Sequence, residues 1–167
     1  MGNNKQAYRV QFGDVAYYDF LLDAGLTPNK SLTIGKLRIP VEFYGSFLRG
    51  VFDGDGTCYG YNDPRWPTSF LYYTGFSSAS KVFLEYLAST NASLYQTKGT
   101  SIRKAPRALS LVYCKADSLI LYAAMYKNAG SLFLGRKRSK LEAFITRDMD
   151  GIIAREARVV KLVNTLL

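Results

Sequence analysis

The stretch FLRGVFDGDG, residues 47–56, carries the densest chemical signal in the chain. Ser46, Gly50 and Gly54 recur every four residues, so in a helix they share one face that carries no bulky side chain. Such a face allows two helices to approach closely. The spacing therefore predicts a helix in this region whose exposed side is a contact surface for a second helix.

Two acids, Asp53 and Asp55, stand where this helix is expected to end. Two such helices packed side by side would bring two copies of Asp55 together, and paired carboxylates with nearby carbonyls are hard oxygen ligands that suit Mg²⁺. A simple turn is the alternative, because Asp and Gly are common turn residues. A calcium-binding EF-hand is excluded, since Pro64 stands where its bidentate Glu is needed.

Composition limits the chemistry further. The 167 residues carry a formal net charge of +9, which favours a polyanion such as nucleic acid as partner. The chain contains no histidine, which excludes catalysis by Ser-His-Asp or Cys-His groups. With no stretch of 18 apolar residues, no signal peptide and two cysteines interpreted as reduced, we expect no membrane partner and an intracellular location.

The apolar pattern alternates between the periods of helices and strands, which is typical of an α+β protein. From residue 42 the expected order is αββαββα, followed by a further helix. The expected elements are a strand at 8–12, a helix at 14–24, a loop at 27–31, a helix at 42–53, strands at 57–61 and 69–76, a helix after Ser77 or Ser78, strands at 93–98 and 108–114 with a basic loop between them, and helices at 115–126, 137–147 and 152–167.

Several segments together resemble the LAGLIDADG homing endonucleases. LRGVFDGDG at 48–56 stands for the motif of that family, and DPRW at 63–66 is similar to a stretch in short bacterial members. GLTPNKSLTIGKLRIP at 25–40, SASKVFLEYL at 78–87 and YKNAGSLFLGRKRSK at 126–140 also resemble family text. The resemblance implies an αββαββα endonuclease domain at 42–147, whose saddle-shaped antiparallel sheet lies on DNA. Residues 1–41 would be an N-terminal extension, as a remnant of a first repeat or as an independent segment, and 148–167 a helical tail. The resemblance also implies a location in the bacterial cytoplasm or in an organelle.

The resemblance implies a sequence-specific, metal-dependent endonuclease that hydrolyses both strands of a long double-stranded DNA target. Asp55 would be the catalytic metal ligand, and the carbonyl of Gly54 would assist. The ion would be Mg²⁺, or another divalent cation such as Mn²⁺ or Ca²⁺. Lys137 would be the basic catalytic residue. The contact between two motif helices would comprise Ser46, Phe47, Gly50, Asp53 and Gly54.

The expected DNA contacts come partly from the alternation of side chains along a strand and partly from the resemblance. Strand alternation places Tyr59 and Tyr61 on the same side as Asp55. The residues expected to contact DNA are Tyr59, Tyr61, Arg65, Trp66, Gln96, Lys98, Arg103, Lys104, Arg107, Arg136 and Arg138. Gln96 would read adenine, whereas the basic residues would bind phosphates or, for Lys98, guanine. The alternatives are an ordinary sheet surface for the tyrosines and solvated basic segments for the rest.

The motif occurs once, so a homodimer is expected to complete the site. A partial repeat relates 14–31 to 117–139 and places Lys30 in the position of Lys137, which leaves open an incomplete two-motif arrangement. A non-cleaving nucleic-acid-binding protein, such as an intron maturase or a transcription regulator, is the alternative function. A purely structural interaction domain is a third.

Overall fold

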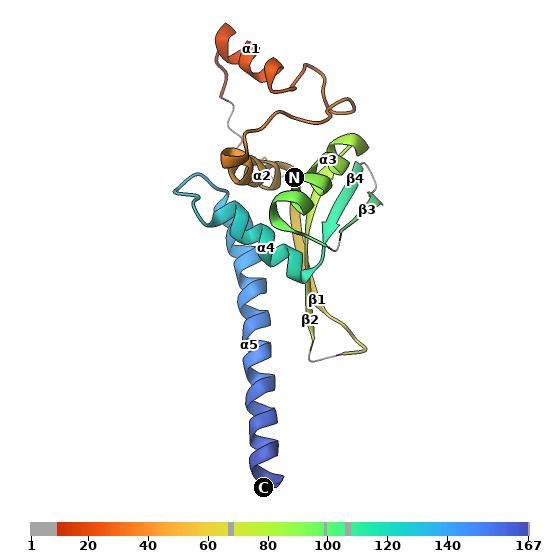
Figure 1. Ribbon diagram of the computed structural model, residues 1–167, viewed down its shortest axis with the longest axis vertical. Helices are drawn as coiled ribbons and strands as arrows, with labels where there is room; N and C mark the ends of the chain where they lie inside the picture. Colours follow the sequence, from red (N-terminus) through yellow and green to blue (C-terminus); the bar gives the residue numbers. More distant parts are fainter. Residues whose placement is uncertain (1–9, 67–68, 99, 106–107, 167) are drawn as a thin grey trace, which may run out of the picture.

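The computed structural model describes residues 10–66, 69–98, 100–105 and 108–166, with side chains as far as residue 152. The fold is α+β. Its helices are α1 (Val15–Asp23), α2 (Val41–Asp55), α3 (Lys81–Tyr95), α4 (Lys115–Tyr126) and α5 (Gly135–Leu166), and its strands are β1 (Thr57–Asn62), β2 (Phe70–Ser78), β3 (Thr100–Ala105) and β4 (Ala108–Tyr113). From α2 onward the described elements follow the expected αββαββα order (Figure 1).

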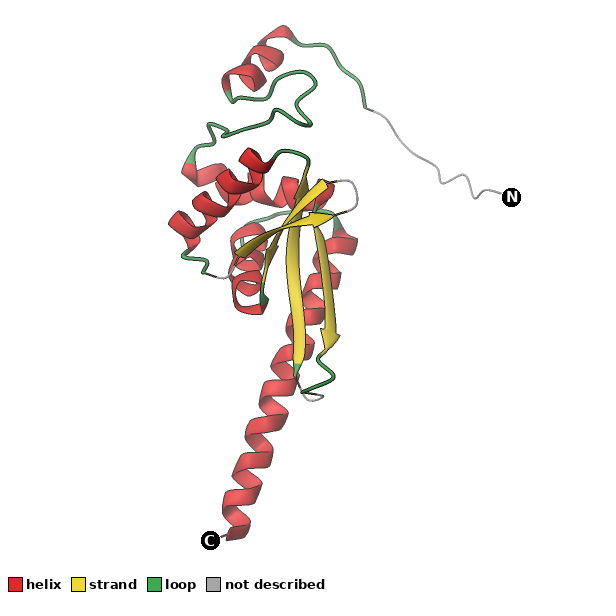
Figure 2. Ribbon diagram, turned by 90° about the vertical axis from the view of Figure 1, so that its right-hand side faces the viewer, coloured by secondary structure: helices red, strands yellow, loops and turns green. Residues whose placement is uncertain are grey.

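The four strands form one antiparallel sheet in the order β1-β2-β4-β3. Helices gather on one side of this sheet, and α5 runs beside the long β1–β2 hairpin (Figure 2). The core lies between the helices and the sheet. Its fully buried large side chains are Tyr44, Leu48, Phe52, Tyr72, Phe76, Leu84, Leu87, Leu111, Tyr113, Leu121, Met125 and Leu141.

Helix α2 begins directly after Pro40 and buries Tyr44, Leu48 and Phe52, which lie four residues apart on the face toward the sheet. The sequence placed its end at Asp53, but the helix continues through Asp55. Both acids therefore belong to its last turn and do not lie beyond it. This difference matters because the direction of each carboxylate is set by helical geometry.

The strand predicted at 93–98 is wrong, because α3 continues to Tyr95. Asn91 explains the longer helix: its buried side chain accepts a hydrogen bond from the Tyr44 hydroxyl and donates one to the Tyr113 hydroxyl. These bonds fix the second half of α3 against α2 and β4. The helix then ends at Gln96, whose φ of 57° lies in the left-handed region.

The predicted basic loop after residue 98 is also different, because Thr100–Ala105 form strand β3 and pair with β4. Lysine and arginine side chains in an edge strand extend into solvent, so charge did not prevent strand formation. Arg107, expected to contact phosphate from this loop, lies outside the described residues.

Other boundaries differ in smaller ways. Residues 10–12, expected in a strand, have no regular structure in the described part of the chain. Helix α1 begins after Asp14 as expected, and the Asp14 carboxylate accepts a hydrogen bond from the Tyr17 amide. Helix α3 is capped by Ser80, not by Ser77 or Ser78.

The tail predicted at 152–167 is continuous with the helix predicted at 137–147. Together they form α5, which extends beyond the body of the protein (Figure 1). None of the helices in the described ranges is both long enough and apolar enough to cross a membrane.

Candidate active site

Asp55 is the last residue of α2 and is exposed at the junction with β1. Within the described residues, its carboxylate has no hydrogen bond or ion pair. An exposed carboxylate with both oxygens free at a helix end remains able to bind a cation. This arrangement distinguishes Asp55 from its neighbour in the motif.

Asp53 instead binds within its own chain. Its carboxylate accepts hydrogen bonds from the Tyr126 hydroxyl at 3.2 Å and from the Leu134 amide at 2.9 Å. Burial, followed by the charge of Asp53, raises the pKa of the Tyr126 hydroxyl, so this group remains a donor at neutral pH. Asp53 was expected at the contact between motif helices, and its observed role is to fasten the end of α2 to α4 and the start of α5.

The other residues expected at that contact mark an exposed side of α2. Ser46, Gly50 and Gly54 are exposed, and a Cβ built on either glycine meets no atom within 4 Å outside its own helical backbone. Phe47 is half-buried and its ring packs near Tyr44. This open side of α2, defined by Ser46, Gly50 and Gly54, carries no bulky side chain, and its two glycines line a cavity that residues 26–37 also border.

Close helix packing inside the chain uses a glycine that the sequence analysis did not select. A Cβ at Gly45 would lie 2.5 Å from the carbonyl oxygen of Ala124, so α2 and α4 approach too closely for any side chain there. The spacing of small residues could not show that Gly45, and not Gly50, makes the close contact within the chain. That difference depends on where α4 packs against α2.

Lys137 lies beside Asp55, but its ammonium is bound to backbone. It donates to the carbonyl oxygens of Phe52 at 2.7 Å, Gly54 at 3.1 Å and Gly56 at 2.7 Å. An ammonium has three hydrogens, so these bonds use its full donor capacity. Burial, followed by repulsion from Arg136, lowers the pKa of Lys137.

These contacts also bear on metal binding. The described residues contain no group of three or more Cys, Asp or Glu side chains that could hold an ion. One copy offers the Asp55 carboxylate and the Gly54 carbonyl, and that carbonyl already accepts from Lys137. The described part of one copy therefore places a single free carboxylate, that of Asp55, at this position.

One side of the sheet faces away from the helices and forms the open side of the sheet. It carries a row of tyrosines. Tyr59 and Tyr61 are exposed there, as parity predicted, and both stack on Tyr73 of β2, with ring centroids 5.1 and 6.1 Å apart. A hydrogen bond with Tyr61, followed by burial, raises the pKa of Tyr73 to about 12. Tyr73 belongs to this row because the hairpin register pairs it with Tyr59.

The basic residues of β3 point to opposite sides of the sheet. Arg103 pairs with Ser110 and shares the open side with the tyrosines, whereas Lys104 pairs with Leu109 on the side of the helices. Both side chains are exposed. Arg103 is therefore placed to contact a ligand on the open side, and Lys104 lies at the edge of the sheet.

Two expected DNA contacts occupy the turn of the β1–β2 hairpin, far along the sheet from Asp55 (Figure 1). Arg65 forms an ion pair with Asp63 at 2.7 Å, and its side chain remains 81% exposed. Trp66 is also exposed. These positions would extend a footprint beyond the candidate catalytic residues.

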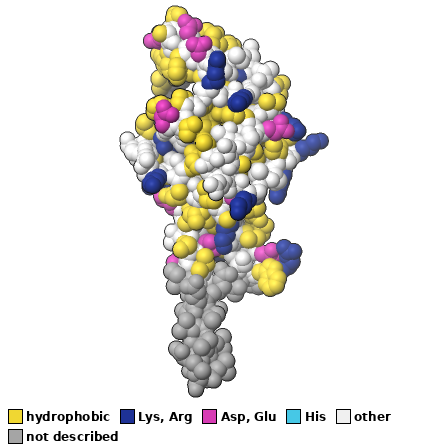
Figure 3. All heavy atoms as spheres, viewed as in Figure 1, with side chains coloured by type: hydrophobic (Ala, Val, Ile, Leu, Met, Phe, Trp, Pro, Cys, Tyr) yellow, Lys and Arg dark blue, Asp and Glu magenta, His cyan; other side chains and the backbone are white. Residues whose placement is uncertain are grey.

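The two arginines expected to contact DNA from the start of α5 differ in their surroundings. Arg136 is exposed, whereas Arg138 binds Glu142 at 2.8 Å and its guanidinium lies 4.5 Å from the centre of the Phe133 ring. Lysine and arginine side chains on the face seen in Figure 3 are spread over the body and do not form one patch.

Gln96 and Lys98 are not on a strand, contrary to expectation. Both belong to the connection between α3 and β3, where the Lys98 amide donates to the Asp117 carboxylate at 3.1 Å. Their side chains are exposed, but the strand from which they were expected to face DNA begins only at Thr100. Their contacts with DNA stay predictions.

A cavity of about 530 Å³ lies beside Asp55, between residues 26–37 and the flank of α2. Lys30, Ser31, Ser77 and Ser78 also line it. These polar groups form only part of the wall. The rest is apolar or carries no side chain and consists of Leu26, Ile34, Leu37, Phe47, Gly50, Val51, Gly54, Ala79 and Phe83.

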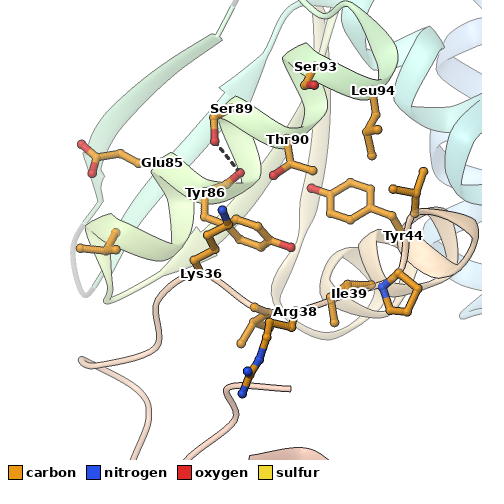
Figure 4. Close-up of a pocket in the computed structure, with 14 residues that line it drawn as sticks. Lys36, Arg38, Ile39, Tyr44, Glu85, Tyr86, Ser89, Thr90, Ser93 and Leu94 are labelled. Atoms are coloured by element: carbon orange, nitrogen blue, oxygen red, sulfur yellow. Dashed lines mark hydrogen bonds between the residues drawn. The ribbon is translucent and has the colours of Figure 1, made fainter. Parts of the chain in front are cut away.

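A larger cavity, about 950 Å³, lies between residues 36–41 and α3 (Figure 4). Tyr44 and Tyr86 border it, with serine and threonine hydroxyls along α3. Asp55 does not line this cavity. The larger of these two cavities is therefore not the one beside the candidate catalytic residue.

No protein-family model matches the chain, and no curated protein matches it.

Proposed function

We propose that this protein is a sequence-specific, divalent-metal-dependent DNA endonuclease that acts as a homodimer on a long double-stranded target. The observation that carries the proposal is Asp55: a free carboxylate at the end of α2, beside an open glycine face. The resemblance of residues 48–56 to the LAGLIDADG motif and the αββαββα order both support it.

In this proposal the Gly50 faces of two α2 helices pack together and bring both Asp55 carboxylates to the dimer axis. Those carboxylates would hold Mg²⁺, or Mn²⁺ or Ca²⁺ in its place. When bound, the ion would supply positive charge that favours water deprotonation and stabilises charge at the phosphate. The net reaction adds one water: a water oxygen bonds to phosphorus, one phosphorus–oxygen ester bond breaks, the leaving oxygen gains a proton and the water loses one.

The open side of the sheet supplies the DNA-binding surface. Tyr59, Tyr61 and Tyr73 offer stacked rings and hydroxyls, and Arg103 adds positive charge on the same side. The net charge of +9 supports contact with a polyanion. Phosphate contacts would position the duplex, and the hydroxyls would contact base edges in the groove.

Cleavage of a random-sequence duplex pool in Mg²⁺, followed by sequencing of the ends, tests the proposal. Wild-type protein should leave defined cuts, and Asp55→Asn should bind DNA without cutting it. Asp19→Asn is the matched control, because Asp19 is an exposed acid on α1. An active Asp55→Asn variant would contradict the assigned site.

A non-cleaving nucleic-acid-binding protein on the same fold is the second candidate. The observation in its favour is that Lys137, the expected basic catalytic residue, is held by three carbonyl oxygens. Salt-dependent DNA binding that leaves every strand intact in Mg²⁺ or Mn²⁺ would favour this candidate over the endonuclease.

A further inference from the structure

Apolar side chains surround helix α1, yet none of its residues is buried. Val15, Tyr18 and Phe20 are 77%, 49% and 63% exposed, and the structure describes the side chains of all nine residues. The Phe12 ring, just before the helix, lies 5.5 Å from that of Tyr17 and is also exposed. A helix that is apolar on all sides is normally covered by protein, and a large exposed apolar patch marks a contact surface. Helix α1 is therefore built to be covered.

Charge limits what can cover α1. Residues 10–26 contain three acids, Asp14, Asp19 and Asp23, and no lysine or arginine. These carboxylates would repel a nucleic acid or an anionic membrane surface, and helices that lie on membranes typically carry cations on their polar face. A basic protein surface would instead attract them. The chain itself has a net charge of +9, so a second copy has the required sign.

The larger cavity, between residues 36–41 and α3, has a size and lining that suit such a helix (Figure 4). Apolar side chains line both of its walls, among them Ile39 and Val82. Along α3 the lining runs from Val82 to Leu94, which is about 18 Å at the rise of an α-helix, whereas the nine residues of α1 span about 14 Å. The described lining residues include none from α1, so the helix does not occupy the cavity of its own chain.

The charges around the larger cavity are opposite in sign to those of α1. Lys36 and Arg38 line it, and neither forms an ion pair with a carboxylate of the described residues. Glu85 is the one acid among the described lining residues, and it is paired with Lys81 at 2.7 Å. The cavity therefore combines apolar walls with positive charge that its own chain does not neutralise.

The end of α1 is fixed at the edge of this cavity. The Arg38 amide donates to the Ala24 carbonyl at 3.0 Å, and the Arg38 guanidinium donates through Nε to the Asp23 carbonyl at 2.6 Å. Arg38 also lines the cavity. Helix α1 and the cavity are therefore neighbouring parts of one surface, which suits a reciprocal contact between two identical copies.

We infer that α1 of one copy docks in the larger cavity of a second copy, and that the two copies exchange these helices reciprocally. The apolar side chains of α1 cover the cavity walls, and its carboxylates lie close to Lys36 and Arg38 of the other copy. The contact uses none of Ser46, Gly50 and Gly54. One helix of nine residues is a small part of the about 20–30 residues a side in a stable interface, so the exchange strengthens the proposed dimer and does not replace the contact through α2. To that extent the inference rests on the proposed function.

Photocross-linking tests the exchange directly. Tyr18→p-benzoyl-phenylalanine, irradiated in solution and run on a denaturing gel, should give a product with the mass of two chains. Mass spectrometry should locate the second peptide of this product at residues 36–41 or 82–94. Met149→p-benzoyl-phenylalanine is the matched control, because Met149 is exposed on α5, and it should not label those segments. A Tyr18 cross-link within one chain, a cross-link to any other segment, or no cross-link overturns the inference.

Dimer affinity gives a second readout. Tyr18→Ser removes an apolar side chain from α1, and Ser89→Trp fills the cavity from an exposed position of α3. Each should raise the Kd of the dimer by about tenfold in analytical ultracentrifugation, with an unchanged circular dichroism spectrum. Met149→Ser should leave the Kd unchanged. An unchanged Kd for either Tyr18→Ser or Ser89→Trp overturns the inference.

The outcomes separate this inference from the proposed function. Cross-linked copies that bind DNA but never cut it support the exchange and contradict the endonuclease. Defined DNA cuts without the cross-link support the endonuclease and overturn the exchange.

Discussion

The ammonium of Lys137 lies 2.7 Å from the carbonyl oxygen of Gly56 and thereby joins the start of α5 to the end of α2. Residues 81 positions apart in sequence meet at the point where the candidate site is built. Carbonyls in the last turn of a helix have few donors within the helix, so a cation there supplies further hydrogen bonds and interacts favourably with the negative end of the helix dipole.

Lys137→Met should therefore lower the free energy of unfolding by about 2 kcal/mol, since charged hydrogen bonds contribute about 1.5–3 kcal/mol. Urea denaturation of the purified variant measures this change. Lys36→Met, an exposed lysine, should differ little from wild type. Equal stability of the two variants would show that the Lys137 bonds do not hold the end of α2.

Asn91→Ala should destabilise the protein by about 2–3 kcal/mol. The substitution leaves the hydroxyls of Tyr44 and Tyr113 without their buried partner, and burying an unsatisfied polar group costs about 1–3 kcal/mol. Ser93→Ala on the exposed side of the same helix is the control. Guanidinium denaturation compares the two, and a neutral Asn91→Ala variant would contradict the importance of this network.

Gly45→Ala should destabilise by about 1–3 kcal/mol, because its Cβ would lie 2.5 Å from the Ala124 carbonyl and force α2 and α4 apart. Gly50→Ala should instead raise stability by about 0.5–1 kcal/mol, since alanine favours a helix and the space there is open. Thermal unfolding at low protein concentration, where monomers dominate, tests this opposite response. Equal changes at the two positions would contradict it.

Gly50→Leu tests the proposed dimer. The bulky side chain fits the single chain, which has nothing within 4 Å of that Cβ, but blocks a second helix from approaching. Light scattering should report a dimer for wild type and a monomer for the variant, with the secondary structure unchanged by circular dichroism. A dimeric Gly50→Leu variant would place the interface elsewhere.

The free energy of unfolding should fall in alkaline solution, because the buried hydroxyl of Tyr113 loses its proton there. Burial raises the pKa of its hydroxyl from 10.0 to about 12, so the folded protein holds this proton more tightly than the unfolded chain does. Its contribution is fully present below pH 10.0 and is lost as the pH rises toward about 12. Phenolate absorbance and unfolding free energies measured across this interval test the sign; Tyr113→Phe should show a weaker decline.

The sequence by itself determined the order of the elements from residue 42 and the position of most of them. Two patterns indicated these elements: apolar residues every four positions in α2, and turn residues between β1 and β2. Both depend only on residues close together in sequence, so they can be recognised before the fold is known. Parity along β1 also placed Tyr59 and Tyr61 correctly on the exposed side of the sheet. The sequence also singled out Asp55.

Tertiary structure alone decided what each charged or small residue near α2 contacts. Asp53 and Asp55 look alike in sequence, but one binds Tyr126 and Leu134 while the other remains free. The length of α3 likewise depended on Asn91, whose partners lie on α2 and β4. Helical and strand periods specify which side of an element a residue occupies, whereas hydrogen-bond partners distant in sequence are fixed only when the elements pack together.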